Sequence, residues 1–144
     1  MDAKLTKNVI SVLNRLLERE YVGVIRYSHY SLMIFGYNRI PIVKWFRDQS
    51  AESLTHAEAL GEQITTLGGH PSLTISKLSE SHKHSMEEIL DESLQHEQEQ
   101  LKDLYELLKL VTDESVLLEE FARNMIVDEE THVAEVQKMV RKSK

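Results

Sequence analysis

The helix-breaking residues of this chain stand at a few positions, and that placement limits the folds it can adopt. The 144 residues include only five glycines and two prolines. Gly36 and Pro41 border one gap, and residues 68–71 (Gly-Gly-His-Pro) begin a second. A softer break lies at residues 112–115 (Thr-Asp-Glu-Ser), a cluster typical of a helix N-cap. Four long segments remain between these breaks.

These segments predict four helices, over residues 4–35, 40–67, 84–111 and 114–141. Each would be close to 30 residues long, or roughly 40 Å at about 1.5 Å per residue. The stretch 70–83 is polar and too long for a tight turn, so we expect it to run along the bundle as a crossover. Four long helices with one long connection predict an all-α, ferritin-like four-helix bundle, in preference to a plain up-down bundle. We expect residues 1–144 to form a single domain.

Composition excludes several classes of function. With 17 basic and 24 acidic residues the formal charge is −7, which argues against a nucleic-acid-binding face. The absence of cysteine excludes disulfides, thiolate metal sites, iron–sulfur clusters and thiol catalysis. The sequence has no run of eighteen apolar residues and no signal-peptide core at its start. We therefore expect a cytoplasmic protein that binds neither nucleic acid nor membrane.

Polar residues interrupt the apolar face of every predicted helix near its middle. A spacing of three and four residues places side chains on one face of a helix, and here that face is mainly leucine, valine and isoleucine. The interruptions are three glutamates and two histidines, namely Glu20, His56, Glu97, Glu129 and His132. All five are therefore expected to meet at the centre of one bundle.

The negative charge of a buried carboxylate needs a compensating positive charge, which these apolar faces do not provide. An isolated buried carboxylate is strongly disfavoured, and no Lys or Arg falls on these faces to pair with Glu97 or Glu129. Divalent cations would supply the charge, and oxygen with imidazole ligands suits iron, manganese or zinc. Taken alone, His56 could be a hydrogen-bonded core histidine, and any one glutamate could lie on the surface if the helix register were misassigned. The coincidence of all five residues, with Glu129-x-x-His132 as the most informative unit, favours a metal site.

Tyr27 lies two turns after Glu20 on the same helix face. It is interpreted either as a core residue or as a hydrogen-bond partner of a metal-bound carboxylate. Glu92, His96 and Glu99 share a face that the leucines predict to point outward. Five histidines off the apolar faces are expected to be exposed, with residues 82–84 a weak candidate for binding an incoming cation. They are His29, His70, His82, His84 and His96.

Residues 8–140 resemble the bacterioferritin family. The resemblance rests on the five residues above and on short matches at Leu13-Asn14, His56-Ala57, residues 67–71 and residues 128–132 (Asp-Glu-Glu-Thr-His). It implies a di-iron site with two ions per subunit, or manganese or zinc in their place. By this resemblance the terminal ligands are Glu20 and Glu97, the imidazole ligands are His56 and His132, and the bridge is Glu129.

One departure from the family concerns a second bridging carboxylate. The family has Glu-x-x-His on its second helix, whereas this chain has Ser53 three residues before His56. Glu52 is the nearest substitute, but it lies to one side of His56 on a helical projection. We expect Glu52 to reach the metals only through a local distortion such as a π-bulge. Otherwise it would resemble the family's inner-surface iron-handling acid.

Two further departures concern haem and assembly. Leu54 stands where the family has an axial methionine, so haem bound in that manner is not expected. Only twelve residues follow His132, so we expect the fourth helix to be short and the family's small fifth helix to be missing. A 24-subunit cage therefore cannot be assumed. At least a homodimer is expected, because Tyr30, Phe35, Tyr37 and Trp45 exceed what one bundle's core needs.

The resemblance implies oxidation of Fe²⁺ by O₂ or peroxide at a di-iron ferroxidase centre, for iron storage or detoxification. Tyr27 would orient a carboxylate or take part in electron transfer. Two alternatives remain open. One is a di-iron oxidase or peroxide-reducing protein that does not store iron, and the other is a degenerate bundle with impaired metal binding, of which Ser53 would be the first sign.

Overall fold

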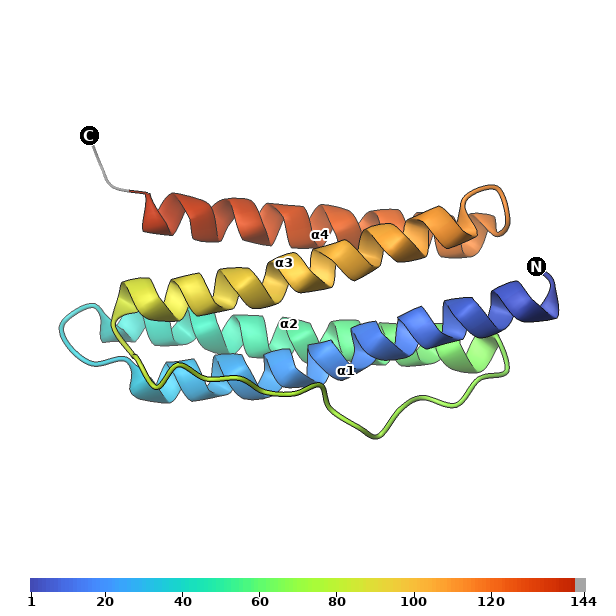
Figure 1. The fold of residues 1–144 in the computed structure, drawn as a ribbon. Helices are drawn as coiled ribbons and strands as arrows, with labels where there is room; N and C mark the ends of the chain where they lie inside the picture. The colour runs from blue at the N-terminus through green and yellow to red at the C-terminus, as the bar shows by residue number, and fades with distance from the viewer. Residues whose placement is uncertain (142–144) are drawn as a thin grey trace.

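The computed structural model describes residues 1–141 and places four long helices side by side (Figure 1). These are α1 (Ala3–Met33), α2 (Arg39–Thr66), α3 (Met86–Val111) and α4 (Val116–Val140). Helix α1 packs against α2 and α3, and α3 packs against α4. The predicted bundle is confirmed, with helix bounds that differ from the predicted ones by at most two residues. In the described range no helix is long and apolar enough to span a membrane.

Short polar side chains fix where the helices begin. Asp2 and Ser115 each accept a hydrogen bond from the backbone N–H three residues later, at the starts of α1 and α4. Ser85 and Glu88 form a reciprocal capping box at the start of α3. The starts predicted at residues 84 and 114 are two residues early, because the capping serines are Ser85 and Ser115.

The connection from α2 to α3 runs along the outside of the bundle, as predicted for the crossover (Figure 1). The Asn14 side chain on α1 holds its beginning, accepting a hydrogen bond from the Ser72 N–H at 2.8 Å and donating one to the His70 carbonyl at 3.2 Å. Further along, Arg26 Nη2 donates to the Ser79 carbonyl at 2.9 Å. These contacts position the segment against α1.

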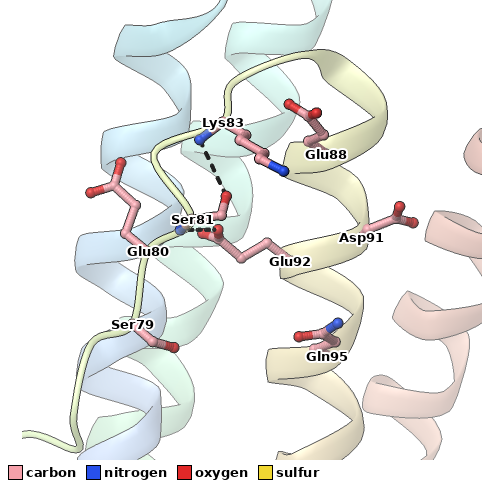
Figure 2. Close-up of a pocket in the computed structure, with 8 residues that line it drawn as sticks. All are labelled: Ser79, Glu80, Ser81, Lys83, Glu88, Asp91, Glu92 and Gln95. Atoms are coloured by element: carbon pink, nitrogen blue, oxygen red, sulfur yellow. Dashed lines mark hydrogen bonds between the residues drawn. The ribbon is translucent and has the colours of Figure 1, made fainter.

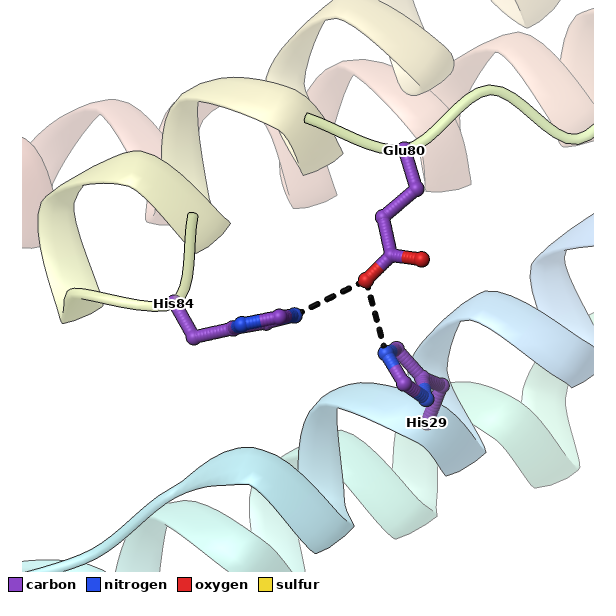
Figure 3. Close-up of side chains that lie close together, drawn as sticks. All are labelled: His29, Glu80 and His84. Carbon is purple, nitrogen blue, oxygen red and sulfur yellow. Dashed lines mark hydrogen bonds and ion pairs between the residues drawn. The ribbon is translucent and has the colours of Figure 1, made fainter. Parts of the chain in front are cut away.

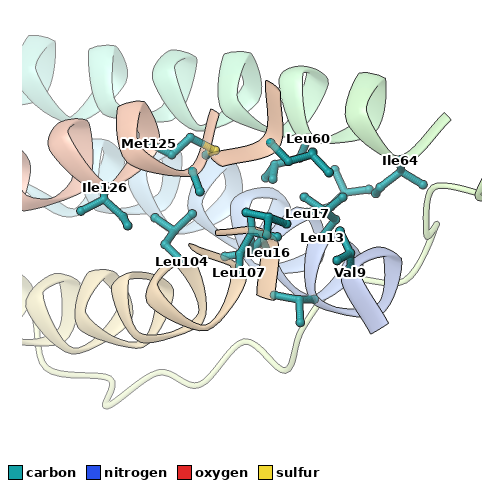
Figure 4. Packing of buried hydrophobic residues seen from close by; sticks show 14 of the residues in the cluster. Val9, Leu13, Leu16, Leu17, Leu60, Ile64, Leu104, Leu107, Met125 and Ile126 are labelled. Atoms are coloured by element: carbon teal, nitrogen blue, oxygen red, sulfur yellow. The ribbon is translucent and has the colours of Figure 1, made fainter. Parts of the chain in front are cut away.

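The apolar core is divided into two clusters that lie on either side of a polar layer. The larger cluster lies toward the chain's N-terminal end of α1 (Figure 4). It contains Val9, Val12, Leu13, Leu16, Leu17, Ala57, Leu60, Ile64, Leu104, Leu107, Val111, Leu118, Ala122, Met125 and Ile126. The smaller one contains Tyr27, Tyr30, Ile34, Val43, Phe46, Ile89, Leu90 and Val136. The polar residues between them therefore lie in an otherwise apolar interior.

A buried ion pair joins α1 to α3 under the crossover. The Arg26 side chain is 6% exposed, and its Nη1 lies 2.6 Å from Glu92 Oε1, which also accepts the Tyr30 hydroxyl at 2.7 Å. The Ser81 N–H donates to the other Glu92 oxygen at 3.0 Å (Figure 2). Burial raises the pKa of Glu92, but the hydrogen bonds from Tyr30 and Ser81 and the Arg26 charge outweigh it and lower the pKa overall.

Two sequence-based expectations about exposure are wrong in this region. His96 is buried because its ring packs against Gly23 and Tyr27 of α1, and Glu92 is half-buried because the crossover contacts it through Ser81; Glu99 on the same face is exposed. Tyr30 is buried in the smaller core cluster, so it does not contribute an exposed aromatic side chain. Phe35 is exposed as expected.

Removal of the Glu92 carboxylate is expected to destabilise the bundle. Glu92→Ala leaves the Arg26 charge buried without a partner, which typically costs about 3–5 kcal/mol. Glu99→Ala, on the exposed part of the same helix, should change the free energy of unfolding by less than about 0.5 kcal/mol. Urea unfolding of both variants measures the difference, and equal stabilities would contradict a structural role for this ion pair.

Candidate metal centre

The five polar residues predicted to meet at the bundle centre are brought together there. Glu20, Glu97 and Glu129 are 4–5% exposed and come from α1, α3 and α4. His56 on α2 and His132 on α4 complete the layer, and their side chains are 14% and 12% exposed. Of residues 1–141, no lysine or arginine lies within ion-pair distance of the three glutamates. The helix periodicity alone therefore predicts which residues gather at this level.

His56 connects two carboxylates on the inner side of the layer. Its Nδ1 lies 3.6 Å from Glu20 Oε1 and 4.0 Å from Glu129 Oε1. Ligand atoms of these three residues all lie within 4.8 Å of one another, as the donors around a single metal ion do. Gln100 also donates to Glu20 Oε1 at 3.0 Å, which fixes the orientation of that carboxylate.

Glu97, His132 and Tyr27 form the other side of the layer. His132 Nε2 lies 3.8 Å from Glu97 Oε1. The Tyr27 hydroxyl donates a short hydrogen bond to Glu97 and lies 3.2 Å from His132 Nε2 and 2.9 Å from Ser93 Oγ. Tyr27 is thus both a core residue, at 1% exposure, and a direct partner of a site carboxylate.

Trp45 supports the site although the sequence interpretation assigned it to a dimer contact. Its ring stacks on His132, with centroids 5.6 Å apart and planes at 12°. Stacking of this kind fixes the orientation of the imidazole. The sequence could have indicated this position, because Trp45 precedes His56 by eleven residues, or about three helical turns, and so lies on the same face of the helix.

Burial and mutual repulsion set the protonation of the carboxylates. Burial and the nearby Glu97 charge raise the pKa of Glu129 well above its ordinary value. Burial also raises the pKa of Glu97, but the hydrogen bond with Glu129 and the His132 ring outweigh it, so that pKa falls. Of the two carboxylates, Glu129 is therefore the one that keeps its proton to higher pH. In addition, Glu129 Oε2 is buried and has no hydrogen-bond partner among the described residues.

Glu20 and His56 form a second coupled pair. Burial raises the pKa of Glu20, although the hydrogen bond with His56 opposes that change. Burial lowers the pKa of His56, but the hydrogen bond and charge of Glu20 outweigh it and bring the pKa to about 8. The imidazole therefore holds a proton at neutral pH when no cation replaces it.

A second group of carboxylates faces the outer nitrogen of His56. Its Nε2 lies 3.7 Å from Glu52 Oε1 and 3.6 Å from Asp128 Oδ2. Helix α2 is α-helical throughout Arg39–Thr66, so the local distortion that would carry Glu52 to the inner carboxylates is absent. Asp128 was missed as a site residue, although it directly precedes Glu129 and so stood within a segment already matched to the family.

Ser53 is small because two helices approach each other closely at this point. A Cβ added to Gly23 on α1 would lie 2.6 Å from Ser53 Oγ on α2. Ser53 lines the central cavity, so the family's carboxylate is replaced at the wall of the site itself. The neighbouring Leu54 is 44% exposed.

The centre is nearly filled by its own side chains and opens toward one side of the bundle. A cavity of about 10 Å³ lies among them, which is close to the volume of one water molecule. An adjoining surface cleft of about 230 Å³ lies between α2 and α4 and shares four of the residues that line the cavity. The shared residues are Gln49, Glu52, Asp128 and His132.

Comparisons with known proteins agree with this architecture. A ferritin-like, diiron-carboxylate protein from Bacillus anthracis is 26% identical, with a TM-score of 0.90 over 98% of this chain and 100% of that one. Rhodobacter capsulatus bacterioferritin is 25% identical, with a TM-score of 0.85 over 97% of this chain and 85% of that one. Dps from Thermosynechococcus elongatus is similar in fold, with 14% identity and a TM-score of 0.89 over 98% of this chain and 95% of that one.

Among curated proteins, no sequence matches this chain. The family model described as the ferritin-like domain matches residues 10–144. That match spans almost the whole chain and includes all of the buried polar layer, and the solved relatives share the same four-helix arrangement. This chain belongs to the ferritin-like domain family.

Proposed function

We propose that the polar layer binds two iron ions and oxidises Fe²⁺ with O₂ or peroxide. The observation that carries this proposal is Glu129, a buried carboxylate with one unpaired oxygen that lies between Glu20 with His56 and Glu97 with His132. Such a group is costly in an apolar interior unless a cation or proton compensates it. The donor set of carboxylate oxygen and imidazole nitrogen suits iron, manganese or zinc, and the similarity to a diiron-carboxylate protein favours iron.

The ligand roles follow from the two halves of the layer. Glu20 and His56 would hold one ion, Glu97 and His132 the other, and Glu129 would bridge them. Bound iron would supply the redox chemistry, while the protein supplies ligand geometry and a mostly apolar surround. Binding requires Glu129 to give up its proton, so uptake of the cation and release of a proton are coupled at this carboxylate.

Glu52 and Asp128 are suited to guide the cation inward. Both line the surface cleft and the central cavity, and both face the outer nitrogen of His56. Together with Glu135 they make the cleft acidic, which raises the local concentration of cations. Rotation of the His56 ring between its inner and outer carboxylates offers a way to pass the ion to Glu20 and Glu129.

Ser53 favours a second candidate function with weaker retention of metal. The chain has no carboxylate at this position, which lies on the wall of the central cavity. A site with one bridging carboxylate would release one ion more readily than a site with two. This would suit a protein that oxidises iron or reduces peroxide without storing iron, or a bundle whose metal binding is impaired.

We further propose that the chain acts as a homo-oligomer. Phe35 and Tyr37 are 78% and 108% exposed, and Ile40 beside them is 84% exposed. These apolar side chains cluster at the turn between α1 and α2, where a second copy would cover them. Either a dimer or a cage would cover these side chains. Native mass spectrometry of iron-loaded protein would distinguish the two, because it reports the number of subunits and the iron content per subunit together.

Loss of the bridging carboxylate should impair iron oxidation. When anaerobic protein loaded with two Fe²⁺ per chain is mixed with oxygen, Glu129→Ala should oxidise iron at least about tenfold more slowly than the parent protein. Glu120→Ala, an exposed change on the same helix, should retain the parent rate. Stopped-flow absorbance measures the rates, and indistinguishable traces for Glu129→Ala and the parent would overturn the proposal.

Tyr27→Phe tests whether the hydroxyl orients Glu97. The variant keeps the aromatic packing but leaves Glu97 and Ser93 without their shared hydrogen-bond partner. Leaving a buried polar group without a partner typically lowers the free energy of unfolding by about 1–3 kcal/mol. We expect iron per chain to be unchanged and the oxidation rate to fall severalfold. Tyr21→Phe on the same helix serves as the matched control. A parent-like rate in Tyr27→Phe would show that the hydroxyl does not act on the reaction.

The stability of the metal-free protein should fall as pH rises from 6 to 9. Both Glu129 and His56 have pKa values raised by folding, so each stabilises the fold when protonated and loses that contribution as pH rises through its folded pKa. For His56 the shift from 6.5 to about 8 corresponds to roughly 2 kcal/mol, lost over that interval. Chemical unfolding in the presence of a chelator measures the free energy of unfolding at each pH. Between pH 6 and 9 it should fall less in Glu129→Gln than in the parent protein, and by the same amount in Glu120→Gln as in the parent. An equal fall in all three proteins would contradict this assignment.

A further inference from the structure

A second cluster of metal-binding residue types lies far from the bundle centre, on the outer face of α1. His29 is on α1, whereas Glu80 and His84 belong to the crossover (Figure 3). Glu80 Oε1 lies 3.0 Å from His29 Nε2 and 2.8 Å from His84 Nε2. The three side chains are 40%, 30% and 23% exposed in the order His29, Glu80, His84, so a cation could reach them from solvent.

The geometry of the three donor atoms is close to that of a metal site. Their ligand atoms all lie within 4.8 Å of one another. Donors about 2.0–2.1 Å from a tetrahedral zinc ion lie roughly 3.3 Å apart, so the two contacts of Glu80 with the imidazoles, at 3.0 and 2.8 Å, would lengthen by a few tenths of an ångström around an ion. Two imidazoles with one carboxylate leave one coordination position for water or a fourth ligand. His82 Nδ1 lies 3.6 Å from the other Glu80 oxygen, outside the group of three donor atoms.

The surroundings also favour a cation. Hydrogen bonds from His84 and His29 lower the pKa of Glu80, so its carboxylate is charged. Glu80 borders a pocket of about 410 Å³ whose walls carry the acidic residues Glu88 and Asp91 and one lysine, Lys83, besides the Glu92 carboxylate that is paired with Arg26 (Figure 2). Cations gather in such a pocket. The positive charge of nearby Arg26 is neutralised by Glu92 at 2.6 Å.

We infer that His29, Glu80 and His84 bind one divalent transition-metal ion that ties the crossover to α1. Each imidazole would bind the ion through the Nε2 lone pair, with the single proton of the ring on Nδ1. His84 directly precedes Ser85, the capping residue of α3, so the ion would also fix the start of that helix to α1. This inference is independent of the central iron site, because no residue is shared.

Zinc binding to the full chain tests the inference. In equilibrium dialysis against Zn²⁺, the parent protein should retain one more zinc ion per chain than His84→Ala. His70→Ala, at the exposed start of the crossover, should retain as much as the parent. Counting the difference between variants makes the result independent of how many ions the central site holds. Equal zinc content in the parent and His84→Ala would overturn the inference.

A conservative variant distinguishes the loss of the metal site from a loss of the fold. Glu80→Gln keeps an oxygen that can accept both imidazole N–H groups but removes the charge, and it should weaken zinc binding at this site by at least about tenfold. Added Zn²⁺ should also raise the melting temperature of the parent more than that of Glu80→Gln. The metal-free melting temperatures of the two proteins should be similar. Parent-like affinity and zinc-induced stabilisation in Glu80→Gln would again overturn the inference, whereas Fe²⁺ oxidation in this variant reports on the central site alone.

Discussion

The burial of three carboxylates without a basic partner is the constraint on which the rest of this structure depends. Glu20, Glu97 and Glu129 divide an apolar core that would be continuous without them. The bundle tolerates them because apolar clusters on both sides hold the four helices together regardless of what the middle contains. The apolar packing and the buried carboxylates are therefore located in different layers of the same bundle, so the free-energy cost of the middle layer is offset by the layers on either side.

The helices hold these side chains more firmly than loops could. Each ligand lies near the middle of a helix of 25–31 residues, where backbone hydrogen bonds are complete on both sides. Groups around the ligands then fix their rotamers: Gln100 holds Glu20, Tyr27 holds Glu97, and Trp45 stacks on His132. Positioning residues of this kind limit the reorganisation that a bound cation would require.

Helical periodicity predicts the fold and the inner ligands because both depend on which residues share a helix face. The same reasoning places Glu20, His56 and Glu129 at one level before any coordinates are known. It fails for His96, because the face of α3 that carries it packs against α1, and that packing is not encoded in the periodicity of α3. It also fails for Asp128, which contacts His56 on another helix at 3.6 Å. The sequence shows which residues share a face of one helix, whereas contacts between different helices can be known only from the packed structure.

The contact between Gly23 and Ser53 fixes the spacing of α1 and α2 at the wall of the cavity. With no side chain at Gly23, α1 comes so close to α2 that a Cβ there would meet Ser53 Oγ at 2.6 Å. Glu20 and Tyr27 are buried on α1 on either side of Gly23, so this spacing also sets the position of two site residues. Ser53 itself supplies no carboxylate to the cavity wall. His56 compensates in part, because its outer nitrogen faces Glu52 and Asp128 across the mouth of the site, where negative charge can be held without the desolvation cost of full burial.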